Sequence, residues 1–533
     1  MARKRAFLSS PAFVYIQAYF LTIASVLGTG ILGLPVTLSN SGLTPFLVTF
    51  VATFLIQVVL IYFFVDLLQK TSHHLLQDAQ EKVSTSSGND ISLQSLGGKA
   101  LSREESSSEE DEAESNPFKS PVKGTPIRPS SAGDDESLQP NLHNMGRLFL
   151  GPWAKYGFDL VILVQFVAFL TGYSLAGSQA FQQLFHISSL KLVIPVFVWT
   201  NVAAIVFAQV IVKPLVSIMT LLKGGILIVT VVVAFVVGSK IHNHTTVDFG
   251  ASGEPFLMGI VAVGGVVNMM PLMYTKVDCR SAKQVTNFRR AVTLGMLTCA
   301  VLNTFWCYAV LSIVSQRCSL CVPSESRPSW MPLNVSQHCC HIAPGELVPD
   351  ECVFCLQQAN THGRISTVPL INVVGARYPN LSWMALLIEL FIVISITVSF
   401  LVYGSALKQL WDGFLAEFQG CRISKCCSAA CCHRITRFLA YKLSFGGIFF
   451  VALSNPEGFI RILDRVGSMG LNLEIVLFVI PMIRASWGSA FKNMPVVVSL
   501  PRWFYWLYVP VFLYSLMAVT YDIASVAADH LYR

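Results

Sequence analysis

Apolar runs of about twenty residues recur from one end of the sequence to the other. A helix of that length crosses the roughly 30 Å hydrocarbon layer of a membrane. Hydrophobic residues make up 53% of the chain and charged residues only 13%, which is more apolar surface than the core of a soluble protein of 533 residues would hold. Because unpaired backbone groups are costly in lipid, these runs are predicted to be helices.

The fold class that we expect is an all-α polytopic membrane protein with about eleven transmembrane helices in a lipid bilayer. The predicted spans are 12–37, 43–69, 155–178, 190–209, 214–238, 256–275, 291–316, 382–407, 438–453, 466–484 and 503–526. Helices 1–2 thus fall in residues 1–69, helices 3–7 in 146–316, and helices 8–11 in 382–533.

Basic residues indicate the orientation of these spans. Lys and Arg gather at the amino terminus, in 276–290 and in 408–442, and the positive-inside rule places all three segments in the cytoplasm. The segments 239–255 and 317–381 then lie on the opposite side. Their glycosylation sequons are Asn243, Asn334 and Asn380, the last of them close to the membrane. The net charge of +7 reflects this orientation and does not indicate a nucleic-acid partner.

Cysteines gather in two loops. In 317–381 they are Cys318, Cys321, Cys339, Cys340, Cys352 and Cys355. An even set on the oxidising side favours disulfides, and zinc bound by two Cys-x-x-Cys pairs is the alternative; we expect no metal. In the cytoplasmic loop 410–437 they are Cys421, Cys426, Cys427, Cys431 and Cys432. Juxtamembrane cysteines are typical of palmitoylation sites, and unmodified thiols are the equal alternative there.

Residues 70–145 form a long insertion rich in Ser, Glu, Asp, Pro and Gly, and this composition predicts a disordered acidic cytoplasmic segment. Ser106, Ser107 and Ser108 precede an acidic run, as in substrates of acidophilic kinases, so phosphorylation is predicted. The tripeptide Asn116-Pro117-Phe118 resembles a ligand of endocytic adaptor domains and favours an endosomal or lysosomal membrane over the plasma membrane. An inert solvated linker is the alternative.

Two spans carry matching helix breakers. The first contains Gly28-Thr29-Gly30 seven residues before Pro35, and the sixth contains Gly264-Gly265 seven residues before Pro271. Gly leaves its backbone uncovered and Pro removes a helix donor, so both spans are predicted to unwind there. Such paired interruptions indicate a transporter binding site, in which free amides and a half-helix amino terminus hold a substrate carboxylate. Close packing of helices at small residues is the alternative.

The stretch from Gly28 to Pro35, continued by Asn40-Ser41-Gly42, resembles the first-span signature of the proton-coupled amino acid transporters in the amino acid/auxin permease family, within the amino acid, polyamine and organocation superfamily. The stretch from Val466 to Pro481 is similar to the family's tenth helix. This resemblance implies two inverted five-helix repeats plus an eleventh helix, with substrate between helices one, six, three and eight. The chain departs from relatives at Ala24, where sodium-coupled members have Asn, and at Leu21, near a His of proton-coupled members.

Polar residues inside the spans are candidates for ion coupling. Lys223 lies near the middle of the fifth span, where an unpaired ammonium is costly, and it resembles a lysine that replaces sodium in some superfamily members if it faces Ala24 and the eighth helix. A lysine at the span boundary is the alternative.

Glu389 is the one acid that we place within the eighth span, and a proton carrier and an interfacial ion pair are its two interpretations. Thr397 and Ser399 resemble the hydroxyls of a sodium site in relatives, although such hydroxyls often bond their own backbone. Tyr173, Gln165 and Asn268 are further residues expected to line the cavity.

The function predicted from these features is secondary active transport of amino acids or similar small solutes, by proton symport or by exchange. An amino-acid sensor with little or no transport, signalling through the insertion, is the alternative. No nucleotide loop, HExxH or GxSxG motif appears in the sequence, so we expect neither an enzyme nor a cofactor.

Overall fold

The computed structural model describes residues 11–28, 30–96, 140–185, 187, 189–207, 209–241, 245–318, 354–378, 380, 382–417, 429–454, 462–492, 494 and 496–531. The chain divides into two units, one formed by Met1–Thr71 with Pro140–Arg533 and the other by Ser72–Gln139.

The described residues form helices and contain no strand. In the first half the elements are α2 (Pro11–Val26), α3 (Gly30–Ser41), α4 (Leu43–Leu96), α5 (Leu142–Phe149), α6 (Ala154–Phe185), α7 (Leu190–Phe207), α8 (Gln209–Ile241), η1 (Phe249–Ala251), α9 (Gly253–Gly264) and α10 (Val266–Tyr274). In the second half they are α11 (Ala282–Ile313), α12 (Leu356–Thr361), α13 (Thr367–Arg377), α14 (Ser382–Glu417), α15 (Ala429–Ser454), η7 (Ile462–Gly467), α17 (Ser468–Glu474), η8 (Ile475–Val479), α18 (Ile480–Trp487), α19 (Ser489–Lys492), α20 (Arg502–Tyr505) and α21 (Tyr508–Leu531).

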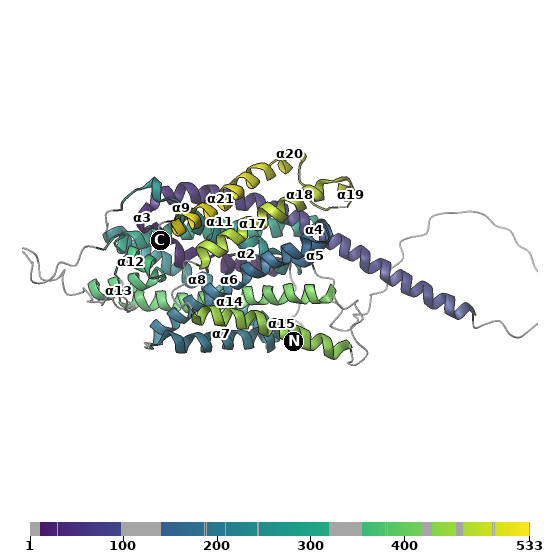
Figure 1. The fold of residues 1–533 in the computed structure, drawn as a ribbon, viewed down its shortest axis with the longest axis horizontal. Helices are drawn as coiled ribbons and strands as arrows, with labels where there is room; N and C mark the ends of the chain where they lie inside the picture. Colours follow the sequence, from purple (N-terminus) through teal and green to yellow (C-terminus); the bar gives the residue numbers. More distant parts are fainter. Residues whose placement is uncertain are drawn as a thin grey trace, which may run out of the picture. The chain divides into compact units, whose positions relative to one another are not determined.

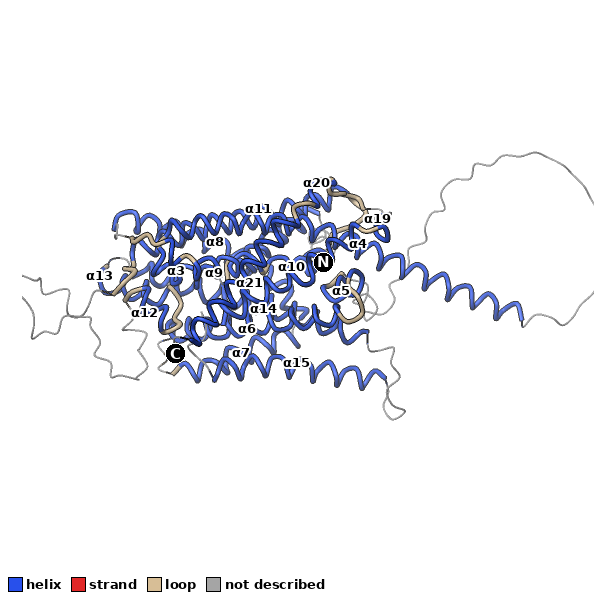
Figure 2. Tube along the Cα trace, turned by 45° about the horizontal axis from the view of Figure 1, so that its top comes forward, coloured by secondary structure: helices blue, strands red, loops and turns tan. Residues whose placement is uncertain are grey.

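Eleven helical segments of the described chain are long and apolar enough to cross a membrane. They are Val14–Ser41, Leu43–Glu81, Ala154–Phe185, Leu190–Phe207, Ile218–Lys240, Gly253–Tyr274, Ala282–Ile313, Trp383–Leu415, Ile435–Ser454, Arg465–Trp487 and Arg502–Ala528. Each lies over one of the eleven runs predicted from hydropathy, and they run side by side in Figures 1 and 2. The prediction of an all-α polytopic membrane protein is confirmed.

The second span is longer than the sequence predicts. We expected it to end at 69 and to be followed by disorder, but α4 continues as helix to Leu96. Side chains one turn apart support this extension, because Lys70 Nζ lies 2.8 Å from Asp66 Oδ2 and His74 Nδ1 lies 3.3 Å from Asp78 Oδ2. The phosphorylation and adaptor motifs at 106–108 and 116–118 lie outside the described residues.

The two spans with predicted breaks are the most enclosed of the eleven. In both the first and the sixth span, 94% of the apolar window is buried, against 22% in the span formed by α15 and 28% in the span formed by α21. The first span packs on the sixth through α3 with α9 and through α2 with α10, and it also packs on α8 and α11. The pair α6 and α14 forms another large contact within the same unit. The breaks therefore lie among helices rather than at the lipid surface.

A single left-handed residue turns the chain from the first span into the second. Gly42 has a φ of 80°, and a Cβ there would lie 2.0 Å from the carbonyl oxygen of Thr246. Only glycine satisfies both conditions. The segment before α9 is held to the same corner, because Asp248 N donates to Ser41 O at 2.9 Å.

The tenth span is irregular. The α-helical segment α17 lies between two π-helical segments, η7 and η8. Such π segments inside a helix frequently mark functional sites, because their extra residue distorts the hydrogen-bond ladder and redirects side chains.

Two of the six loop cysteines, Cys318 and Cys355, form a disulfide with their Cα atoms 5.4 Å apart. It joins the end of α11 to the start of α12. Asn380 is exposed just before α14. The other modification candidates lie outside the described residues or in side chains that the structure does not describe: Asn243, Asn334, Cys321, Cys339, Cys340, Cys352, Cys421, Cys426, Cys427, Cys431 and Cys432.

Candidate functional site

The first span is interrupted at the predicted glycines. α2 ends at Val26 and α3 begins at Gly30, and the last backbone hydrogen bond before the break joins Leu27 N to Ile23 O at 3.0 Å. A Cβ on Gly28 would lie 2.5 Å from Ser399 Oγ and 2.8 Å from the Tyr173 hydroxyl. The backbone at the break therefore lies against side chains of both the third and the eighth span. Thr29 lies outside the described residues.

The sixth span breaks at one residue. Gly265 separates α9 from α10 with φ −67° and ψ −7°, so ψ departs from its helical value while φ does not. A Cβ on Gly265 would lie 2.2 Å from the hydroxyl of Tyr403. Pro35 and Pro271 lie inside α3 and α10, beyond the breaks. The glycines, rather than the prolines, thus mark the points where the helices are interrupted.

Lys223 binds the open end of α2. Its side chain is fully buried, and Nζ donates to Ala24 O at 2.9 Å, to Ser399 Oγ at 3.1 Å and to Ser395 O at 3.3 Å. Ser399 Oγ also donates to Ala24 O at 2.9 Å. Three acceptors match the three N–H groups of an ammonium, and the carboxyl end of a helix attracts positive charge.

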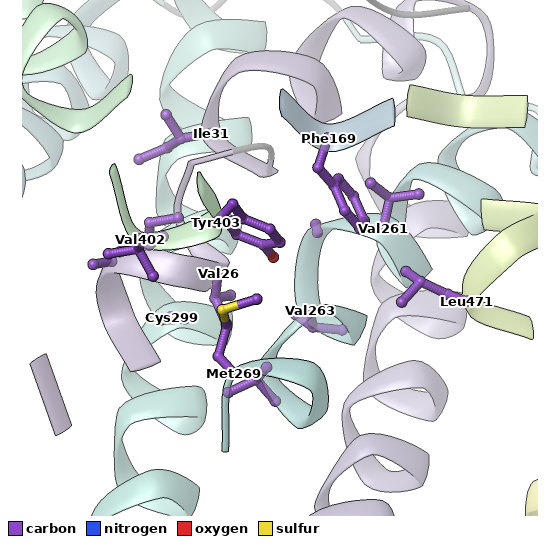
Figure 3. Packing of buried hydrophobic residues seen from close by; sticks show 14 of the residues in the cluster. Val26, Ile31, Phe169, Val261, Val263, Met269, Cys299, Val402, Tyr403 and Leu471 are labelled. Carbon is purple, nitrogen blue, oxygen red and sulfur yellow. The ribbon is translucent and has the colours of Figure 1, made fainter. Parts of the chain in front are cut away.

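Two tyrosines close the space between the breaks. Tyr173 on α6 and Tyr403 on α14 have ring centroids 5.5 Å apart, and both are buried. In Figure 3 the hydroxyl of Tyr403 points toward the sixth span, where Val261 and Val263 are labelled. The sequence predicts Tyr173 as a cavity residue but not Tyr403, which lies one helical turn after Ser399 on the same face of α14.

Asn303 on α11 is a second residue at the breaks that the sequence does not predict. Its side chain is fully buried, and neither its amide nitrogen nor its amide oxygen has a hydrogen-bond partner. A Cβ on Gly30 would lie 3.0 Å from Asn303 Oδ1, so this amide faces the first residue of α3. An unpaired buried amide costs about 1–3 kcal/mol, so a polar group that entered this space would find hydrogen-bond partners in Asn303.

Asn268 and Gln165 lie together, beside Glu474 of the tenth span. Asn268 Nδ2 donates to Gln165 Oε1 at 3.0 Å, and each residue donates to Glu474 Oε2 at 2.8 Å. Gly264 is on the same side, since its Cβ would lie 3.0 Å from Leu471 Cδ1 and 3.5 Å from Gln57 Nε2. Glu474 was not predicted, although it falls in the stretch that resembles the tenth helix of the permease family.

The remaining ion-coupling candidates are on α14. Ser399 contacts Lys223, as described above. Thr397 Oγ1 donates to Val393 O at 2.7 Å, the bond to its own helix that is the ordinary alternative for a membrane hydroxyl. Glu389 is half-buried and lies about 15 Å along the helix axis from Ser399.

A separate ion cluster lies where α5 packs against α6 and α14. His143 Nδ1 lies 2.7 Å from Asp159 Oδ2, and His143 Nε2 lies 3.2 Å from Glu417 Oε2. Glu417 also pairs with Lys155. Partial burial acts to raise the pKa of Glu417, but the hydrogen bond and charge of Lys155 outweigh it and hold that pKa below its usual value.

The sequence matches no protein-family model and no curated protein. Among solved structures, the chain is similar to a manganese transporter of Eremococcus coleocola in complex with an aromatic bis-isothiourea substituted compound, at 11% identity over 98% of this chain and 87% of that chain, with a TM-score of 0.49. A variant of that transporter matches at 10% identity over 96% of this chain and 88% of that one, with a TM-score of 0.48. Identities this low assign the chain neither a family nor a substrate.

Proposed function

We propose that this chain is a secondary transporter of amino acids and binds its substrate between the breaks of the first and sixth spans. The observation that carries the proposal is that each of the two interrupted spans places a helix carboxyl end and a helix amino end at its break. α2 and α9 end at the breaks, and α3 and α10 begin there. The end of a helix leaves carbonyls, and the start of a helix leaves amides, without partners inside that helix. A zwitterion carries one charge for each kind of end.

The substrate carboxylate is expected at the amino terminus of α3. The first amides of α3 have no partner within the helix, and the helix dipole favours negative charge there. Asn303 faces Gly30 with both polar atoms unpaired. It therefore supplies a donor from α11 to the same carboxylate.

The substrate ammonium is expected at the carboxyl end of α9. The last carbonyls of a helix have no N–H donor within that helix and can accept hydrogen bonds from the ammonium. Tyr403 lies against this break through Gly265, and Tyr173 lies against the other through Gly28. We therefore expect both tyrosines to contact the substrate side chain. Their close packing favours small amino acids over large ones.

Lys223 is proposed to take the place of a coupling cation. The ammonium already holds α2 to α14, so this link between the broken span and the eighth span needs no sodium. Transport is therefore expected without sodium.

An organic solute also fits the chemistry of the site better than a metal ion. Within the described part of the chain, no group of three or more His, Cys, Asp or Glu side chains could hold a metal ion. The groups at the breaks are backbone amides and carbonyls, hydroxyls and one ammonium. The donors among them bind a carboxylate and the acceptors bind an amine by hydrogen bonds.

We also propose that the amino terminus is cytoplasmic and that the membrane is endosomal or lysosomal. The basic segments 276–290 and 408–442 support the orientation through the positive-inside rule. The adaptor-like tripeptide at 116–118 supports the compartment. These two proposals are independent of the binding site.

Uptake by purified full-length protein in liposomes tests the function. Radiolabelled glycine, alanine, proline, glutamine, leucine and arginine are offered at acidic and neutral pH, with and without sodium. We expect uptake of small amino acids without sodium, a loss of at least tenfold in Gly28→Leu, and little change in Gly225→Leu, because a Cβ on Gly225 meets no atom within 4 Å. Binding without flux would instead support the sensor. The absence of both binding and flux would overturn the proposal.

A further inference from the structure

The hydrogen bonds around Glu474 leave two oxygens without donors. Gln165 Nε2 donates to Gly470 O at 2.9 Å and to Glu474 Oε2 at 2.8 Å, and Asn268 Nδ2 donates to Gln165 Oε1 and Glu474 Oε2. These four bonds use all four N–H groups of the two amides. Glu474 Oε1 and Asn268 Oδ1 are buried and have no partner.

An excess of buried acceptors is costly, and it is relieved when one acceptor gains a hydrogen. An unpaired buried acceptor is costly, and a buried carboxylate that accepts hydrogen bonds only from neutral amides costs more. Glu474 is 1% exposed within the tenth span. A proton bound at Oε1 removes the charge and turns one of the two bare oxygens into a donor.

The other titratable groups around α17 are engaged elsewhere or lie farther along their helices. Among the side chains that the structure describes on the elements packed against α17 and on α10, they are Lys155, Tyr156, Asp159, Tyr173, Glu254, Tyr274, Arg465, Tyr508, Tyr514, Tyr521 and Asp522. Asp522 accepts from Ser468, about 9 Å along the axis from Glu474. Asp159 pairs with His143, about 9 Å along α6 from Gln165. Both donors to Glu474 are uncharged amides.

The cluster is joined directly to the break of the sixth span. Asn268 lies in the first turn of α10, immediately beyond Gly265, and it donates to Glu474. On the other side of the break, Gly264 lies against Leu471 of α17. Glu474 is the last residue of α17, where the π-helical segment η8 begins. A movement of α10 relative to α9 therefore changes the hydrogen bonds of Glu474.

We infer that Glu474 is the proton-binding site that couples amino acid transport to a proton gradient, with Asn268 and Gln165 as its positioning residues. Glu474 takes up one proton from the compartment that supplies the substrate, forming the O–H bond at Oε1. It releases that proton on the other side after α10 has moved, and the O–H bond breaks there. The inference rests on the proposed function and adds the coupling ion and its residue.

The test compares Glu474→Gln with the wild-type protein in liposomes that contain a pH-sensitive dye. Gln keeps the shape of the side chain but carries no titratable proton. We expect wild-type protein to acidify the lumen when alanine is added and to accumulate alanine against its gradient when the outside is acidic. In Glu474→Gln, accumulation and acidification fall at least tenfold, while exchange of labelled for unlabelled alanine stays within about threefold. Glu254→Gln, an exposed acid at the start of α9, serves as the matched control.

Two outcomes separate this inference from the proposed function. If wild-type protein exchanges alanine and Glu474→Gln still couples it to protons, the inference fails and transport stands. The inference also fails if Glu474→Gln abolishes sodium-driven uptake, since the site would then bind a metal cation.

If the wild-type protein shows no flux at all, infrared spectra decide the proton site independently. A pH-dependent C=O stretch of a protonated acid that disappears in Glu474→Gln and shifts in Glu474→Asp supports it, and identical spectra of all three proteins overturn it.

Discussion

The ammonium of Lys223 donates a 2.9 Å hydrogen bond to the carbonyl oxygen of Ala24. The carbonyl belongs to the last turn of α2. Because the helix is interrupted there, this carbonyl lacks the backbone N–H donor that a following helical turn would supply. A side chain of the fifth span thus stabilises the interrupted first span and links it to Ser399 of the eighth. Ala24, Lys223 and Ser399 are parts of one hydrogen-bonded arrangement.

Replacement of Lys223 by Met is expected to reduce transport at least tenfold and to lower the free energy of unfolding. The reason is that Ala24 O loses its charged donor, and a hydrogen bond to a charged group contributes about 1.5–3 kcal/mol. Uptake in liposomes and thermal unfolding in detergent measure the two effects. Lys191→Met, at an exposed position on α7, is the control. An uptake rate of Lys223→Met equal to that of the wild type would show that transport does not need the link to α2.

Gly265→Ala is expected to abolish transport by steric conflict, and Tyr403→Phe is expected to restore it in the double variant. The new Cβ would lie 2.2 Å from the Tyr403 hydroxyl but 3.4 Å from the adjacent ring carbon, so deletion of the oxygen removes the conflict. The φ of −67° at Gly265 suits alanine, which leaves the hydroxyl as the cause. Uptake by the two single variants and the double variant forms a cycle. Additive losses would mean that the two residues do not meet.

Asn303→Asp is expected to raise the substrate KM at least tenfold, because it replaces a neutral amide beside Gly30 with a negative charge that repels the substrate carboxylate. Asn303→Leu, which removes the donor without adding charge, should have a smaller effect. The measurement is uptake at a series of amino acid concentrations. If Asp and Leu raise KM equally, Asn303 acts through packing and does not face the carboxylate.

The ion pair of Glu417 predicts a loss of stability in acid. Because the folded pKa of Glu417 lies below its unfolded value of about 4.3, the contribution is complete above about pH 5 and disappears as the pH falls through the folded pKa. Glu417→Gln should therefore unfold at a lower temperature than wild type at neutral pH, by an amount equivalent to at most about 1 kcal/mol. The difference should vanish in strong acid. A constant difference across the pH range would assign the effect to packing.

The sequence predicted the spans well because apolar length is a local property. The break positions were also predictable, since Gly28 and Gly265 have no side chain and their neighbours occupy that space. The partners were harder to foresee. Glu474, Tyr403 and Asn303 are single polar or aromatic residues in ordinary-looking spans, and only the packing of distant helices brings them to Asn268, Gly265 and Gly30.

The length of α4 illustrates a second limit. Polar composition indicated disorder from residue 70, but the same residues form ion pairs one turn apart and continue the helix. Composition indicates whether a segment can form a hydrophobic core of its own. It does not indicate whether a helix that begins in the membrane ends at the membrane surface or continues into water.

Cryo-electron microscopy of the full-length protein in lipid nanodiscs, with the best substrate of the uptake panel, tests the binding site most directly. We predict density for the amino acid between the two breaks, with its carboxylate within hydrogen-bond distance of the first amides of α3 and of Asn303. Continuous helices through Gly28 and Gly265, or substrate density away from both, would contradict the account.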